Sequence, residues 1–459
     1  MGMVTRSQRR RLIEEEERLD RISCLPDDVL GEIVSLLPTK DGARTQVLSS
    51  RWRPLWRSAP LNVDLHGYIP GRFIETGDIS RILSAHPGPG RRFAIPSCYL
   101  PFGGRPVATL DAWLQSPAVD NLRELEIHYS SAWPGRPQPP LPASTRRFSP
   151  TLTVASFDGC CFPDSNNAGA LHLPVLKQLR LLWVRVSDSS LHALLANCPA
   201  LEILLLSYCE GCSRVRIVSH TLKSIGVKPG GGDLHLQQLI LEDAPVVERL
   251  LFVGKMDILV ISAPRLSILG ELSDDISRLK FSSTGFQGQC NVGLAMVVCG
   301  VKILALTNMR LSLDAVINFM KFFPCLEKLY ITTITAGKKN VWCHKYRSLI
   351  GSLNIRLKKL VLINYRGNKS HVNFVKFFIL NARVLESMIL ELESTKPTSA
   401  WIERQHRLLQ TKNRVSTGLH IEILYHDRQP GPLGWVRAAV QALNLSTADP
   451  FVRFRDWSF

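Results

Sequence analysis

The segment Leu201-Glu202-Ile203-Leu204-Leu205-Leu206 has a Leu-x-x-Leu-x-Leu spacing that returns, with substitutions, along most of the 459-residue chain. Alternate side chains of an extended segment lie on the same face, so this spacing predicts a short strand with a buried face. One such unit cannot bury its leucines alone, and we therefore expect successive units to stack into a solenoid. The spacing recurs at Leu122/Leu125/Ile127, Leu176/Leu179/Leu181, Leu222/Ile225/Val227, Leu236/Leu239/Leu241, Leu326/Leu329/Ile331, Leu357/Leu360/Leu362 and Leu385/Met388/Leu390.

A second pattern precedes several of these segments. The turn Asn197-Cys198-Pro199-Ala200 leads into Leu201, and similar turns precede Leu326 and Leu385. Each turn follows a stretch whose apolar residues return at helical spacing. A helix, a turn and a short strand per unit is the leucine-rich repeat, so the predicted fold is an irregular α/β solenoid with a parallel sheet on its inner face and helices and loops outside. The helical apolar residues are Leu191/Leu194/Leu195, Val316/Phe319/Met320 and Phe374/Phe377/Phe378.

The residues before the repeats predict a small all-α unit. Leu25-Pro26-Asp27-Asp28 favours a helix start, because proline fits the first turn and carboxylates suit the positive end of the helix dipole. The apolar residues of Val29–Leu37 then form a helical stripe that Pro38 ends, and we expect a second short helix over about 40–48. A third element carries two tryptophans. So small a unit cannot bury all of this apolar surface, and the surplus should meet a partner.

This head resembles the F-box of plant F-box/leucine-rich-repeat proteins, both in Leu25–Asp41 and in Val47–Trp56. The resemblance implies docking to the Skp-type adaptor of an SCF (Skp–cullin–F-box) ubiquitin ligase and, through the adaptor, to a cullin. It also implies a non-catalytic subunit that holds a target protein. The adaptor contacts that it implies, some of which must instead form the small core, are Leu25, Pro26, Val29, Leu30, Ile33, Leu37, Pro38, Val47, Leu48, Trp52, Leu55 and Trp56.

The inner face of the solenoid is the surface on which we expect a target protein to bind. Side chains alternate across a strand, so the residues between the buried leucines should face inward. This places acidic residues early and basic residues late along the surface, and it places Gln238 and Glu242 there as well. No motif identifies the target. The predicted target contacts are Glu124, Glu126, His128, Arg180, Tyr330 and Lys359.

A second resemblance lies near the end of the chain. Leu357–Asn368 and Asn381–Met388 resemble the FBD module that follows the repeats in many plant F-box proteins. No role is predicted for the tail. The expected organisation is a charged mobile arm (1–20), an F-box (21–60), irregular leucine-rich repeats (61–340), an FBD-like module continuing the solenoid (341–425) and a C-terminal tail (426–459).

The chain is basic, with a net charge of +17. The segment from Lys328 to Arg383 contains twelve Lys or Arg residues and no Asp or Glu. Such a field could attract nucleic acid or an acidic partner, which is the alternative function. We favour a solvated basic face, because the charges alternate with the apolar positions of a folded repeat.

Motifs for chemistry are absent from the sequence. There is no Gly-x-x-x-x-Gly-Lys-Ser/Thr phosphate loop and no Gly-x-Ser-x-Gly elbow. Cys209 and Cys212 have the spacing of a zinc half-site or a redox motif, but no second pair follows, so we expect no metal and no cofactor. The chain shows neither a secretory signal nor an apolar run of membrane length, which predicts a cytoplasmic and/or nuclear protein in which cysteines are mostly buried hydrophobic residues.

Overall fold

The computed structural model describes residues 22, 24–65, 74–100, 104–129, 138–162, 171–230, 236–273, 278–281, 284–286, 298–309, 311–333, 355–392, 397–425 and 443–451. The chain divides into two compact units, Met1–Ser156 and Phe157–Phe459, and each is treated by itself below. The expected arm at 1–20 lies outside the described residues.

The first unit begins with the predicted helical head. Helix α2 covers Asp27–Leu36, α3 covers Thr39–Arg44 and continues into a 3₁₀ turn at Thr45–Val47, and α4 covers Trp52–Ser58. The head is therefore all-α, although its second helix is shorter than predicted. Its core consists of Leu30, Val34, Trp52, Leu55 and Ala59, against which Leu25 and Trp56 pack.

Three parallel strands follow the head in the first unit. Strand β1 (Leu61–Asp64) pairs with β2 (Gly90–Ile95), and β2 pairs with β3 (Glu124–His128). The connections contain α5 (Thr76–Ala85) and α6 (Gly104–Leu114). Short 3₁₀ helices cover Ser97–Tyr99, Pro117–Val119 and Ala143–Phe148, and the boundary between the units falls within β4 (Val154–Asp158).

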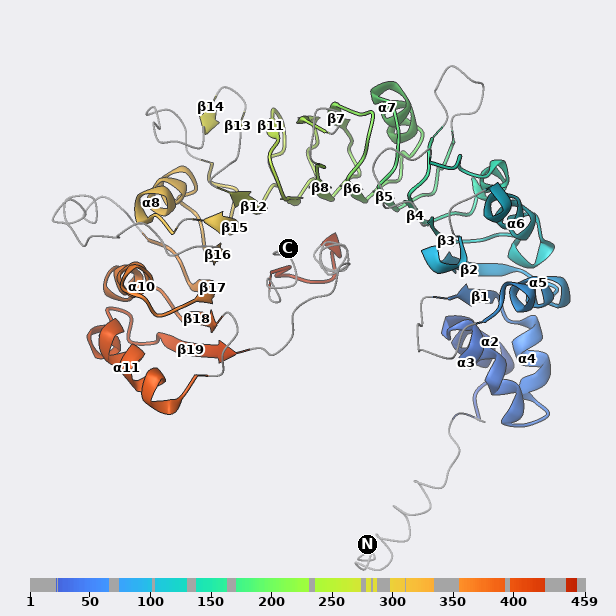
Figure 1. Ribbon diagram of the computed structural model, residues 1–459, viewed down its shortest axis with the longest axis horizontal. Helices are drawn as coiled ribbons and strands as arrows, with labels where there is room; N and C mark the ends of the chain where they lie inside the picture. The colour runs from blue at the N-terminus through green and yellow to red at the C-terminus, as the bar shows by residue number, and fades with distance from the viewer. Residues whose placement is uncertain are drawn as a thin grey trace, which may run out of the picture. The chain divides into compact units, whose positions relative to one another are not determined.

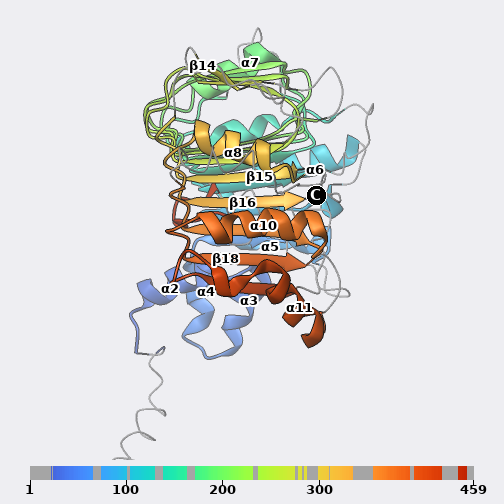
Figure 2. The ribbon, with the colours of Figure 1, turned by 90° about the vertical axis from the view of Figure 1, so that its left-hand side faces the viewer.

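The second unit contains a large parallel sheet, which confirms the predicted α/β solenoid. Its strands follow an arc, with α7 (Asp188–Ala196), α8 (Leu313–Phe322), α10 (Lys369–Asn381) and α11 (Ser399–Leu409) on the outer side (Figures 1 and 2). A 3₁₀ turn at Thr411–Asn413 follows α11. The sheet contains, in spatial order, β5 (Gln178–Leu182), β6 (Ile203–Ser207), β8 (Ser224–Lys228), β10 (Arg249–Phe252), β12 (Ile268–Ser273), β15 (Ile303–Met309), β16 (Lys328–Thr333), β17 (Lys359–Tyr365), β18 (Ser387–Leu392) and β19 (His420–Tyr425).

A second sheet replaces outer helices in the middle of this unit, which the sequence analysis did not predict. The chain alternates between the two sheets from β6 to β13. In the second sheet, Arg214–Val218 alternates exposed and buried side chains, as expected of a strand with one face against the core. Gln238 and Glu242, predicted for the inner face, lie in this second sheet instead. It contains β7 (Arg214–Val218), β9 (Gln238–Asp243), β11 (Asp257–Val260), β13 (Arg278–Phe281) and the antiparallel β14 (Thr284–Phe286).

Candidate protein-binding surfaces

The first candidate surface is apolar and lies on the helical head. Val29 and Ile33 on α2 are exposed, and so are Val47 (84% exposed) and Leu48 (64% exposed) at the turn that precedes α4. Leu36 is 61% exposed as well, although it is absent from the predicted contact set. These five apolar side chains, which we call the head surface, are available to a partner because the core of the head is already complete without them.

The structure sorts the other predicted adaptor contacts by burial. Leu30, Trp52 and Leu55 are buried in the core of the head, so they support the fold and are not part of an exposed surface. The cause is the helical period, which turns Leu30 and Val34 inward and leaves Val29 and Ile33 one position away on the outer side. Pro26 and Pro38 are exposed, and Leu25, Leu37 and Trp56 are half-buried.

Polar contacts fix the head to the first strand within the first unit. The Thr39 hydroxyl donates to the carbonyl of Asn62 (2.8 Å) and accepts from the backbone N–H of Asp64 (2.9 Å). The Asn62 amide donates to the carbonyl of Leu37 (2.7 Å). These bonds hold the end of α2 and the start of α3 on the edge of β1, which presents the head surface in one orientation relative to the strands of this unit.

A buried histidine adds a second link. The ring of His86, which follows α5, packs edge-on against Trp56 with 5.4 Å between centroids. His86 Nδ1 accepts from the backbone N–H of Gly88 (3.0 Å), and Nε2 lies 3.3 Å from the carbonyl oxygen of Trp56. Burial lowers the pKa of His86 below its usual value, and the bond to Trp56 opposes this shift. The neutral ring, donating through Nε2, satisfies both contacts.

The predicted acidic contacts of the inner face lie around one arginine. Arg92 on β2 contacts Asp64 (3.1 Å), Glu124 (2.7 Å) and Glu126 (3.1 Å). Glu126 is buried and lies 4.0 Å from Nε2 of His128. One guanidinium faces three carboxylates, so this part of the inner face is acidic, but the carboxylates also hold neighbouring strands together.

The predicted contacts in the second unit have different environments. Arg180 on β5 is half-buried and donates to Gln178 (3.3 Å). Tyr330 on β16 is buried, since residues 443–451 of the tail cover it, and its hydroxyl donates to Asp449 (2.7 Å). Tyr330 is therefore not an exposed contact in this structure. Lys359 Nζ lies 5.4 Å from the centroid of the Tyr330 ring.

Two lysines of the basic region are paired. Lys328 Nζ lies 2.7 Å from Asp449, and Lys358 Nζ lies 2.9 Å from Glu327. Residues 334–354, which contribute further basic side chains to this region, lie outside the described residues.

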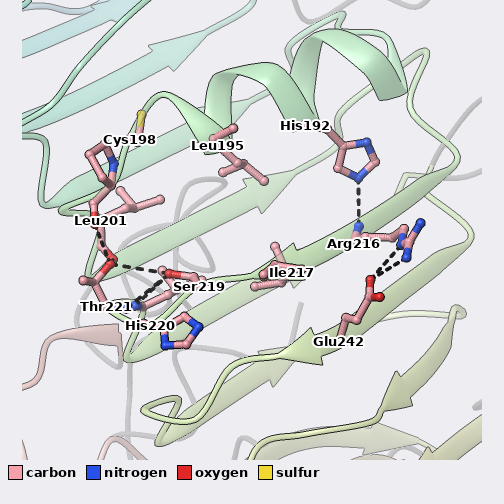
Figure 3. Close-up of a pocket in the computed structure, with 14 residues that line it drawn as sticks. His192, Leu195, Cys198, Leu201, Arg216, Ile217, Ser219, His220, Thr221 and Glu242 are labelled. Carbon is pink, nitrogen blue, oxygen red and sulfur yellow. Dashed lines mark hydrogen bonds and ion pairs between the residues drawn. The ribbon is translucent and has the colours of Figure 1, made fainter.

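A pocket of about 650 Å³ lies on the outer side of the second unit, between α7 and β7 (Figure 3). Its polar groups bond to one another: His192 Nε2 accepts from the backbone N–H of Arg216 (2.9 Å), and the Arg216 guanidinium donates to Glu242 (2.6 Å). Burial raises the pKa of Cys198 at its edge to about 12, which keeps that thiol protonated. This arrangement supplies no activated nucleophile.

The Cys-x-x-Cys pair is buried. Cys209 and Cys212 lie in the connection between β6 and β7, and burial raises the pKa of Cys209 to about 12, which disfavours the thiolate that zinc requires. Among the described residues, no cluster of three or more His, Cys, Asp or Glu side chains could hold a metal. In the same part of the chain, no helix is both long and apolar enough to cross a membrane. The expectation that cysteines are mostly buried fails at Cys24, Cys98 and Cys299, which are exposed.

Three protein families match consecutive parts of the chain. The F-box domain matches residues 22–64, the repeats described as "FBD-associated F-box protein At5g56370, LRR repeats" match residues 110–331, and FBD matches residues 345–390. These regions coincide with the helical head, with most of the repeats, and with a segment that includes β17, α10 and most of β18.

The chain is also similar to F-box proteins of Arabidopsis thaliana. FBD-associated F-box protein At4g10400 is 26% identical over 403 residues, which are 82% of this chain and 93% of that protein. F-box/FBD/LRR-repeat protein At5g56420 is 33% identical over 213 residues, which are 45% of this chain and 47% of that protein. FBD-associated F-box protein At5g56370 is 35% identical over 197 residues, or 41% and 44%.

The fold and these matches define an F-box protein with leucine-rich repeats. More particularly, the chain is a plant F-box/leucine-rich-repeat protein with a C-terminal FBD module. An F-box in general implies binding to a Skp-type adaptor, so this composition supports a role as an F-box substrate adaptor.

Proposed function

We propose that the protein is the substrate-recognition subunit of an SCF-type ubiquitin ligase. The head surface docks the Skp-type adaptor, which connects the chain to a cullin, and the repeats hold a target protein. The observation that carries this proposal is the head surface itself: exposed apolar side chains surround a core that is already closed. Apolar side chains gathered on one small unit are typical of a protein-binding surface.

The proposed role is geometric and needs no catalytic residue in this chain. Binding the target and the scaffold through two surfaces of one chain raises the effective concentration of target lysines near a conjugating enzyme. The work would take place where such ligases meet their targets, in the cytoplasm and/or the nucleus, and a fluorescent fusion of the full chain in plant cells tests that location.

The decisive experiment is binding of the purified full chain to a purified Skp-type adaptor. We expect a stable one-to-one complex by size-exclusion chromatography, which then recruits a cullin. Affinity purification with mass spectrometry should recover adaptor, cullin and target together, and the target should be ubiquitylated by the reconstituted complex. A folded chain that forms no complex with any Skp-type adaptor would contradict the proposal.

A further inference from the structure

The tail segment Leu443–Phe451 lies on the concave side of the second unit, against the inner face of the parallel sheet (Figure 1). Leu443 and Phe451 are fully buried there. They join one apolar cluster with side chains from strands between β5 and β17, and Leu445 packs at its edge. The cluster includes Leu182, Ile203, Leu205, Leu251, Ile268, Ile303, Ala305, Tyr330, Val361 and Ile363.

Small residues on the inner face create the space for these two side chains. A Cβ added at Gly226 on β8 would lie 2.8 Å from Leu443, and one added at Gly270 on β12 would lie 2.8 Å from Phe451. Ala305 on β15 borders the second hollow, 2.7 Å from the same added Cβ at Gly270. The inner face therefore has two hollows, each filled by one apolar side chain of the tail.

Two cations on this apolar face bind the polar groups of the segment. The Arg249 guanidinium donates to the carbonyl oxygens of Asn444 (2.7 Å) and Thr447. Lys328 Nζ and the Tyr330 hydroxyl both lie 2.7 Å from one carboxylate oxygen of Asp449, whose side chain is only 9% exposed. A partly buried cation is unfavourable without an anionic or carbonyl partner, so this face requires such groups in whatever covers it.

These contacts resemble those of a bound peptide more than those of a strand of the fold. Among the described residues, the segment forms no backbone ladder with the sheet. It is held by inserted side chains and by hydrogen bonds from Arg249, Lys328 and Tyr330. Arg249 and Asn444 are 195 residues apart in the chain.

We propose that this inner face is the target-binding site, and that it recognises an extended acidic–apolar segment of the target. Such a segment has one apolar side chain for the hollow at Gly226, an aromatic side chain for the hollow at Gly270, and a carboxylate between them for Lys328 and Tyr330. The tail segment Leu443–Phe451 occupies the same site as an intramolecular competitor, which a target displaces. This inference rests on the proposed function, since it names the class of target that the repeats hold.

The test uses the full chain and a fluorescent peptide with the sequence of residues 443–451. The wild-type chain should bind the peptide weakly, because its own segment competes at high effective concentration. The variant Asp449→Lys should release the tail and bind the peptide at least tenfold more tightly. Lys328→Glu combined instead with Asp449→Ala, so that the chain's own tail does not regain an ion pair, should lower the affinity for the peptide about tenfold or more, and a peptide carrying lysine in place of the aspartate should restore it.

Controls separate this inference from its alternatives. Lys321→Glu, on the outer helix α8, should leave peptide binding unchanged, and a scrambled peptide should not bind. Failure of the folded Asp449→Lys variant to capture the peptide, or of the charge-swapped peptide to recover binding, would overturn the inference. The inference would also be overturned if Phe451→Ala made the whole second unit unfold cooperatively at a low temperature. In that case the tail segment would be part of the core and not a displaceable competitor. Adaptor binding should be equal in all variants, and its loss in every protein, wild type included, would instead contradict the proposed function.

Discussion

Truncating the two most exposed apolar side chains of the head surface, Val47→Ala with Leu48→Ala, should abolish tight adaptor binding and leave the fold intact. Both side chains lie outside the core, and exposed substitutions usually change the free energy of unfolding by less than about 0.5 kcal/mol. Burying a Val or Leu side chain at an interface contributes about 1.5–3 kcal/mol. Because alanine keeps the Cβ, we expect the pair to lose about 2–4 kcal/mol of binding free energy, or about 30- to 1,000-fold in Kd.

The assay is isothermal titration calorimetry of the purified full chain with a purified Skp-type adaptor. The matched control is Val218→Ala with Ile261→Ala, which truncates two exposed apolar side chains of the second unit, one of them 62% exposed. The control should bind like the wild type. An unchanged Kd for the Val47→Ala/Leu48→Ala protein, with an unchanged melting temperature, would refute our assignment of the docking surface.

Three further predictions concern stability and reactivity. Leu30→Ala leaves a cavity in the core, so it should lower the free energy of unfolding of the head by about 2–5 kcal/mol in a denaturant titration. A decrease below about 1 kcal/mol would contradict the assigned core. The pKa of His86 is lowered in the folded protein, so the unfolded chain takes up a proton first as pH falls below about 6.5. The melting temperature of the wild type should therefore fall between pH 7 and 5. If the melting temperature of His86→Gln falls as steeply over this pH range, another group causes the effect. Iodoacetamide at pH 8 should alkylate the exposed Cys24 and Cys98 long before Cys209, because burial raises the pKa of Cys209 to about 12. Early labelling of Cys209, detected by mass spectrometry, would contradict its burial.

Much of the repeat architecture follows from local spacing. The pattern at Leu201, Leu204 and Leu206 predicts a strand whose leucines are buried, and the structure confirms it in β6. Helices α7, α8 and α10 also contain the predicted apolar stripes. Strands and helices with regular periods are detectable because their burial repeats at intervals that the backbone geometry sets.

Several strands of the large parallel sheet are absent from the predicted repeats, among them β10, β12 and β15. The spacing is present in β10 and β15, as Val247/Leu250/Phe252 and Val301/Leu304/Leu306, with Val or Phe at leucine positions. Leu236/Leu239/Leu241, in contrast, satisfies the pattern but lies in the second sheet. A buried strand has the same period on either side of the solenoid, so its sequence does not identify the sheet that it joins.

The sequence by itself determined the stacked α/β repeats and a helical head with more apolar surface than it can bury, because local periodicity encodes both. Only the tertiary structure decided which apolar residues of the head are core, since Leu30 and Val29 are neighbours in the same stripe. The same holds for the place of the tail. Leu443 and Phe451 form no periodic pattern, and their burial depends on hollows at Gly226 and Gly270, which distant parts of the chain supply only after the strands have assembled.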